Sequence, residues 1–221
     1  MKILFKFASR SRPTKFFQVL DNIRAYAVSN YHVLCSLDVD DTRMNDERVR
    51  QRLASYDRVT AIYGNSINKV HAINRDMNYV DGWDILIVVS DDMIFIKPGF
   101  DADIIEDMRE LFPHGDGVLH YPDSTAKDAL MTMSIMDKRY YDRTGYIYYY
   151  EYISLWCDNE AMEVARQLGR YRFVNKRLFD HLHPAYGLAQ WDEQYYKTES
   201  YMGIDGETFK KRKAKNFGLI L

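Results

Sequence analysis

Short apolar runs alternate with segments of helical pattern through the first half of the chain. The runs that are typical of strands cover residues 3–7, 32–37, 59–63 and 85–89. Between them, apolar side chains recur every three or four residues, as an amphipathic helix requires. Phe16, Leu20 and Ile23, which follow Pro13, illustrate this spacing. Because strands that alternate with helices form right-handed crossover units, the pattern predicts an α/β fold with a mainly parallel sheet.

The second half of the chain is less regular. Its strand candidates cover residues 117–121, 130–136 and 179–183. A tyrosine-rich segment at 140–152 follows no clean period, and Asp158-Asn159-Glu160 opens a later helix. No internal repeat or linker divides the sequence. We therefore expect a single domain over residues 1–221, with a regular half to about residue 100 and a less regular half from about residue 101.

Composition narrows the class of protein. A formal net charge of -2 provides no overall positive field, so nucleic acid is not indicated as a partner. Two cysteines are too few for a disulfide framework or a structural zinc cluster. Lys6 interrupts the apolar start of the chain, which therefore lacks the apolar region of a signal peptide, and no run is long enough to span a membrane. These features predict a cytoplasmic protein.

The most distinctive motif, Ser90-Asp91-Asp92, comes directly after the apolar run at 85–89. Ligands of open α/β sheets bind at the carboxyl ends of the parallel strands. Adjacent carboxylates at that edge suit a divalent cation such as Mg²⁺ or Mn²⁺, which prefers oxygen ligands and often binds a substrate phosphate as well. The alternative is a polar turn with solvated acids.

Polar side chains also follow the first two strands. Ser9, Arg10 and Arg12 come after the first strand, where guanidinium groups can bind a diphosphate or stack on a base. Asp38 and Asp40 follow the second strand and can accept hydrogen bonds from a ligand. Solvated arginines in a turn and an acidic helix cap are the structural alternatives.

Two further groups of residues fall near predicted strand ends. Asn65 and Lys69 follow the third strand at a glycine-containing turn, where a helix N-terminus favours anions, although Asn65 also suits a helix cap. His181 and His183 share one face if their segment is extended, so they can bind a metal together or contact diphosphate oxygens. The alternative for this pair is two half-exposed histidines.

The order of these motifs resembles a small family 2 glycosyltransferase of the GT-A fold. The matching features are Ser9-Arg10-Ser11-Arg12-Pro13 after the first strand, acids after the second, Asp91-Asp92 after the fourth, and an acid that opens a late helix. The resemblance implies a Rossmann-like, three-layer α/β/α sandwich. It also implies transfer of a sugar from a nucleotide diphosphate sugar to a glycan or another hydroxyl acceptor, with Mn²⁺ or Mg²⁺ as cofactor.

The resemblance also implies roles for individual residues. Asp91 or Asp92 would hold the metal, and a late histidine, His181 or His183, would complete its shell. Because neighbouring side chains on a strand point to opposite faces, one aspartate can bind directly while the other acts through water or sugar hydroxyls. The residues expected to bind the nucleotide sugar are Ser9, Arg10, Arg12, Asp38, Asp40, Asn65, Lys69 and Asp91.

An inverting transfer needs a base that removes the proton of the acceptor hydroxyl. The resemblance places Glu160 in that role, with Asp158 as its competitor, although both acids also suit a helix start. Aromatic candidates for acceptor binding are Tyr148, Tyr149, Tyr150 and Trp156.

Residues from 1 to about 100 would then bind the nucleotide sugar, and those from about 101 to 221 would bind the acceptor and carry catalysis. Two alternative functions are a nucleotidyltransferase of similar fold and a non-catalytic module that binds a nucleotide or a glycan.

Overall fold

A seven-stranded sheet forms the centre of the molecule in the computed structural model, which describes residues 1–124 and 126–219. The strand order is β3-β2-β1-β4-β7-β6-β8. The first four strands run parallel to one another and are β1 (Lys2–Ala8), β2 (Asn30–Asp38), β3 (Val59–Gly64) and β4 (Ile85–Val89). All four were predicted from their apolar runs, and the mainly parallel sheet is confirmed.

The other half of the sheet is built from three short strands, which are β6 (Val118–His120), β7 (Ile135–Asp137) and β8 (Tyr171–Phe173). β7 runs antiparallel to both β4 and β6, whereas β6 and β8 are parallel. The strand expected at 130–136 is thus mostly loop, although Met131 and Met133 are buried. The alternating apolar residues of this segment correctly indicated that their side chains are buried, but a buried side chain can also lie in a loop.

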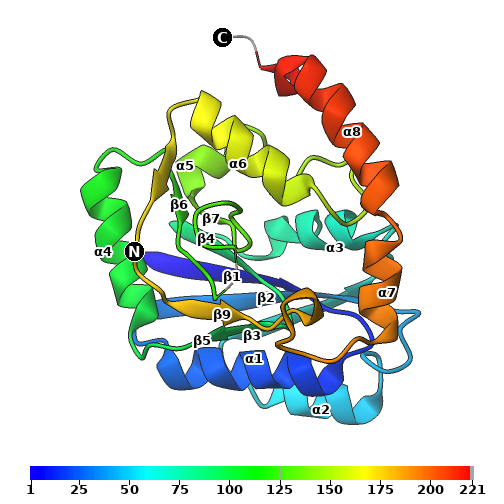
Figure 1. The fold of residues 1–221 in the computed structure, drawn as a ribbon. Helices are drawn as coiled ribbons and strands as arrows, with labels where there is room; N and C mark the ends of the chain where they lie inside the picture. The colour runs from blue at the N-terminus through cyan, green and yellow to red at the C-terminus, as the bar shows by residue number, and fades with distance from the viewer. Residues whose placement is uncertain (125, 220–221) are drawn as a thin grey trace.

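Helices cover both faces of the sheet (Figure 1). The helices on one face are α1 (Pro13–Tyr26), α2 (Glu47–Ala54) and α4 (Phe100–Leu111). Those on the other face are α3 (Lys69–Asn74), α5 (Lys138–Tyr141), α6 (Cys157–Gln167) and α8 (Met202–Ala214). Short 3₁₀ turns cover Met77–Tyr79, Pro184–Tyr186 and Asn216–Gly218. The three-layer arrangement predicted from the sequence is confirmed.

Two separate cores follow from the alternation of side chains along the central strands. Ile3, Phe5 and Phe7 of β1 point into the core under α1, and Leu4 points into the core under α6. Lys6 also lies on the α6 side and is fully buried, with its Nζ donating to the backbone oxygen of Arg75 over 2.7 Å and to the Ser36 hydroxyl. A buried ammonium group needs such partners.

A small two-stranded sheet pairs β5 (Met93–Phe95) with β9 (Phe179–His181) in antiparallel fashion. The predicted late strand at 179–183 therefore exists, but it lies outside the main sheet. Met93 is directly opposite His181, and the Leu182 amide donates to the backbone oxygen of Asp92 over 2.7 Å. This pairing brings the late histidine to the end of β4.

Helix α7 (Glu193–Glu199) lies at the edge of the sheet where β1 and β2 end, and it leads into α8 (Figure 1). Within the described parts of the chain, no helix combines the length and the apolar character that crossing a membrane requires.

Candidate active site

Asp91 lies at the carboxyl end of β4 and joins it to the end of β1. The Ser9 hydroxyl donates to Asp91 Oδ2 over 2.6 Å, and Arg12 donates to Asp91 Oδ1 over 2.9 Å. Burial raises the pKa of Asp91 and the charge of Asp92 adds to this effect, while Arg12 opposes it. Asp91 thus holds Arg12 in place at this edge.

Asp92 points to a different set of partners. The hydroxyl of Tyr195 donates to Asp92 Oδ2 over 3.0 Å, His181 Nε2 lies 3.5 Å from Asp92 Oδ1, and Ser90 also donates to this carboxylate. Burial would raise the pKa of Asp92, but the hydrogen bond and positive charge of His181 outweigh burial and lower it. The two neighbouring aspartates therefore have distinct surroundings, as expected for adjacent side chains.

His181 sits between two carboxylates. Its Nδ1 lies 3.7 Å from Asp123 Oδ2, on the side opposite Asp92. Burial would lower the pKa of His181, but Asp123 and Asp92 together raise it to about 9. Burial and the charge of His181 lower the pKa of His183, whose ring packs edge-on against Tyr195.

The residues around Asp92 fit part of a divalent metal site. Asp92 and His181 present a carboxylate oxygen and an imidazole nitrogen 3.5 Å apart, and both side chains are largely buried. Among the residues that the structure describes, no cluster of three or more His, Cys, Asp or Glu side chains is arranged to hold a metal. A cation here would take its remaining ligands from substrate oxygens and water, as Mg²⁺ and similar ions commonly do.

Arg10 binds the acids that follow β2. It donates to Asp38 Oδ2 over 2.9 Å and to both oxygens of Asp40 over 2.8 Å. Asp38 is buried and its Oδ1 has no hydrogen-bond donor among the described residues, whereas the Asp40 side chain is 68% exposed. Asp38 therefore has one buried oxygen that accepts no hydrogen bond within the described residues.

Arg75 is a site residue that the sequence did not reveal. It donates to the backbone oxygen of Leu37 over 2.6 Å, and its Nη2 lies 3.8 Å from Asp38 Oδ1. A side chain at Gly64 would come within 2.7 Å of the Arg75 guanidinium, so the glycine leaves room for this group. Locally, Arg75 resembles any surface arginine after a short helix.

Helix α7 adds two more residues that the sequence did not reveal. Asp192 caps the helix by accepting from the Tyr195 amide over 3.0 Å, and it also pairs with Arg12. The Arg12 guanidinium lies 3.8 Å from the centre of the Tyr195 ring. The sequence did not indicate the role of Asp192, because its partner Arg12 is 180 residues away.

Asp158 lies in the first turn of α6. This helix begins after Trp156, whose φ of 63° is unusual for a residue other than glycine. Burial raises the pKa of Asp158, and the positive charges of Lys69 and His181 oppose the rise. Lys69 is exposed at the start of α3, and its charge also acts on Asp92. Asp158, Lys69, His181 and Asp92 therefore share one electrostatic neighbourhood.

Glu160 has different neighbours. It accepts from the Tyr152 hydroxyl over 2.7 Å and from Arg212 of α8, also over 2.7 Å, and it is only 3% exposed. The structure does not bring Glu160 into the group around Asp92. Asn65 is exposed after β3, beyond the buried part of the group.

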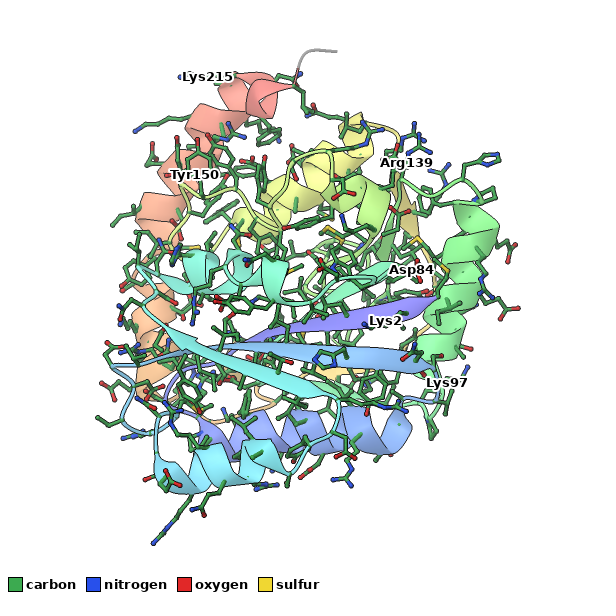
Figure 2. All side chains as sticks on the ribbon, turned by 180° about the vertical axis from the view of Figure 1, so that it is seen from behind. Lys2, Asp84, Lys97, Arg139, Tyr150 and Lys215 are labelled. Carbon is green, nitrogen blue, oxygen red and sulfur yellow. The ribbon has the colours of Figure 1, made fainter. Side chains whose placement is uncertain are left out.

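The aromatic residues expected to bind an acceptor are mostly engaged in packing. Tyr148 is buried, and Trp156 packs against Phe209. The guanidinium carbon of Arg212 lies 3.4 Å from the centre of the Tyr149 ring. Tyr150 is 67% exposed and lies beside α8 (Figure 2).

Comparison with known proteins gives similarity in structure alone. No family profile and no curated protein matches the sequence. The mannosyltransferase PcManGT from Pyrobaculum calidifontis, solved with GDP-Man and Mn²⁺, superposes with a TM-score of 0.62 at 13% identity. The match covers 80% of this chain and 54% of that one, so the chain spans about half its length.

Two other solved structures are similar over more of their own length. Glucosyl-3-phosphoglycerate synthase from Mycobacterium tuberculosis has a TM-score of 0.59 at 13% identity, with 82% of this chain and 71% of that chain covered. For 4-diphosphocytidyl-2C-methyl-D-erythritol synthase from Anaerococcus prevotii the TM-score is 0.55 at 10% identity, with coverage of 79% and 86%. With its mainly parallel sheet and its helices on both faces, the chain has the GT-A fold.

Proposed function

We propose that this protein is a metal-dependent, inverting glycosyltransferase that uses a nucleotide diphosphate sugar. The observation that carries the proposal is the pairing of Met93 with His181, which sets an imidazole beside Asp92 while Asp91 holds Arg12 at the same edge. Carboxylate, imidazole and guanidinium groups together suit a metal-bound diphosphate. The GT-A fold of the chain supports this reading.

Asp92 and His181 are the residues that would hold the metal, with His183 beside them. A bound divalent cation would neutralise the charge that develops on a leaving diphosphate. An imidazole ligand favours Mn²⁺ over Mg²⁺, which prefers oxygen throughout. Arg12 and Lys69 would orient the diphosphate by charge-assisted hydrogen bonds.

The nucleoside would lie over the ends of β1 and β2. Asp38 has an oxygen there that accepts no hydrogen bond and faces Arg75, and Arg10 and Asp40 form the rim around it. Ser9 would act indirectly by orienting Asp91, and Asn65 lies further out at the end of β3. In this proposal, about residues 1–100 bind the donor, and about residues 101–221 bind the acceptor and carry catalysis, within one domain.

Asp158 is the base that the electrostatics favour over Glu160. A carboxylate with a raised pKa accepts a proton more readily, and burial raises the pKa of Asp158. Glu160 is instead held by Arg212 and Tyr152. Asp158 would take the proton of the acceptor hydroxyl while the hydroxyl oxygen bonds to the anomeric carbon. The diphosphate would leave from the opposite side, which inverts the configuration of that carbon.

Release of UDP or GDP from a panel of UDP- and GDP-sugars tests this proposal. We expect release that depends on Mn²⁺ and falls by about a hundredfold or more when Asp91→Ala and Asp92→Ala are combined. Asp57→Ala changes an exposed aspartate outside the site and is the matched control. Activity that survives the double substitution would refute the role of the metal site.

A nucleotidyltransferase is the second candidate, because 4-diphosphocytidyl-2C-methyl-D-erythritol synthase has a similar fold. It would release pyrophosphate from a nucleoside triphosphate and would give Asp158 no obvious task. Pyrophosphate release without sugar transfer would favour it.

A further inference from the structure

Residues 184–191 form an uncharged segment between β9 and α7, drawn in orange in Figure 1. Their sequence, PAYGLAQW, carries no charge in a chain of which 28% is charged. Its large apolar side chains are exposed, with 54% of Tyr186, 44% of Leu188 and 43% of Trp191 open to solvent. Apolar side chains that gather on a surface often mark a binding site, whereas single ones need no explanation.

A row of rings connects this segment to Asp92. His181 lies next to Asp92, and the His183 ring is 5.4 Å from that of His181. Trp191 follows at 6.2 Å from His183, edge-on. Tyr196 then stacks on Trp191 at 5.3 Å with an angle of 25° between the rings. The row therefore runs without a gap from a buried carboxylate to the surface.

The outer rings are held on a fixed element. Asp192, directly after Trp191, caps α7 and pairs with Arg12. Tyr195 is buried and donates to Asp92, so its neighbour Tyr196 faces outward and is 64% exposed. Tyr196 lies on this helix and Trp191 directly precedes its cap, so both rings lose little conformational entropy when a ligand binds, which favours affinity.

The charges around this surface narrow the kind of ligand. Residues 184–196 contain no lysine or arginine but include Asp192 and Glu193. The basic side chains packed beside them, Arg12 and Lys15, are both paired with Asp192, and Lys197 follows the segment. A phosphate or an acidic lipid surface would need basic side chains here. A neutral carbohydrate fits better, because the C–H faces of sugar rings pack on aromatic rings while polar groups such as Gln190 and Glu193, both exposed, can bind hydroxyls.

We propose that Trp191 and Tyr196, together with Tyr186, which packs edge-on against His183, bind the carbohydrate acceptor of this enzyme. That the bound carbohydrate is an acceptor rests on the proposed function, whereas carbohydrate binding at this surface does not. It moves the acceptor surface from Tyr148, Tyr149, Tyr150 and Trp156 to the segment before α7 and to Tyr196 of that helix. A chain of sugars lying along the ring row would direct one end toward Asp92.

Calorimetric titration with neutral oligosaccharides, without nucleotide or metal, tests the surface. The probes are cellohexaose, xylohexaose, mannohexaose and chitohexaose. We expect at least one to bind, and we expect Trp191→Ala to weaken it by about tenfold, the effect of losing one stacked ring. Trp191→Phe should retain most of the affinity because it keeps an aromatic face, and Tyr196→Ala provides a second variant on the same row.

Tyr79→Ala is the matched control, since Tyr79 is 61% exposed and lies in the 3₁₀ turn before β4, at the opposite edge of the sheet. Failure of all four probes to bind, or equal binding by wild type and Trp191→Ala, would overturn the proposal. Binding to phosphatidylcholine vesicles that Trp191→Ala abolishes would overturn it in favour of a lipid surface. Sugar binding without release of UDP or GDP would keep this surface while refuting the proposed transfer.

Discussion

Asp158 and Glu160 lie two positions apart in the first turn of α6, and their carboxylates have opposite surroundings. Each residue of a helix is rotated by about 100° from the last, so positions two apart point to nearly opposite sides. Asp158 is affected by Lys69 and His181, whereas Glu160 meets Arg212. Both acids were candidates from the sequence, and the packing of α6 gives them different partners.

Substitution of these two acids separates catalysis from stability. Asp158→Asn keeps the size of the side chain but removes the base, so we expect kcat to fall by about a hundredfold or more, with little change in stability. Glu160→Gln breaks a buried ion pair with Arg212 and should lower the free energy of unfolding by about 3 kcal/mol. Nucleotide release assays and urea unfolding measure the two effects.

The two variants serve as controls for each other, because both replace one carboxylate of the same helix turn by an amide. The opposite pattern, with kcat lost in Glu160→Gln and retained in Asp158→Asn, would transfer the role of base to Glu160.

Helices α7 and α8 supply much of the support for the site. Only Tyr195 of the seven residues of α7 is buried, and α8 buries only Asp205 and Phe209. Sequence patterns detect helices through an apolar stripe, and one or two buried positions do not make a stripe. The strands β1 to β4 were predictable because each contains a continuous apolar run. Helix α7 was not, because it is held by long-range polar contacts such as that of Arg12 with Asp192.

Asp205 of α8 holds the loop that leads into α6. It is fully buried and accepts hydrogen bonds from three consecutive amides, those of Ile153, Ser154 and Leu155, over 2.7 to 2.9 Å. Asp205→Ala leaves three buried or half-buried amides without this acceptor, so we expect a loss of about 3 kcal/mol in the free energy of unfolding. Because Asp158 follows this loop, kcat should fall as well. Urea unfolding and nucleotide release measure these changes.

Asp101 of α4 provides a matched control. It is also fully buried and accepts from the amides of Val28 and Ser29, far from α6 in the sequence. Asp101→Ala should reduce stability in a similar way but leave kcat unchanged at a temperature where the protein is folded. Hydrogen exchange should increase at Ile153–Leu155 only in Asp205→Ala. Equal effects of the two variants on kcat would contradict the assigned role of Asp205.

At the scale of the whole molecule, strand order places residues from distant parts of the sequence at one edge. Parallel pairing of β1 with β2 and β4 brings Arg12, Asp38 and Asp91 to one edge of the sheet. The alternation of strands and helices along the sequence was sufficient to predict this placement. His181 reaches the same edge through β9, which was predicted as a strand, but the sequence did not indicate the pairing of β9 with β5. Asp123, in a loop before β7, completes the surroundings of His181.

Two buried basic side chains, His181 and Lys6, make the stability of the metal-free molecule depend on pH in opposite directions. The pKa of His181 rises from 6.5 to about 9 on folding, so the folded state binds the extra proton and stability falls as pH rises between these values. Burial lowers the pKa of Lys6 from 10.5 to about 8, so its contribution rises with pH in that interval. Each full unit of pKa shift corresponds to about 1.4 kcal/mol.

Urea unfolding of the wild type and His181→Gln between pH 6 and 10, with a chelator present, separates these contributions. The wild type should lose stability from pH 6.5 to about 8 and then level off, as Lys6 begins to compensate. His181→Gln should show no loss in the first interval and a gain in the second. His114→Gln, which removes an exposed imidazole, is expected to follow the wild type. Parallel curves for wild type and His181→Gln would mean that Asp92 and Asp123 do not hold a protonated His181 in the folded protein.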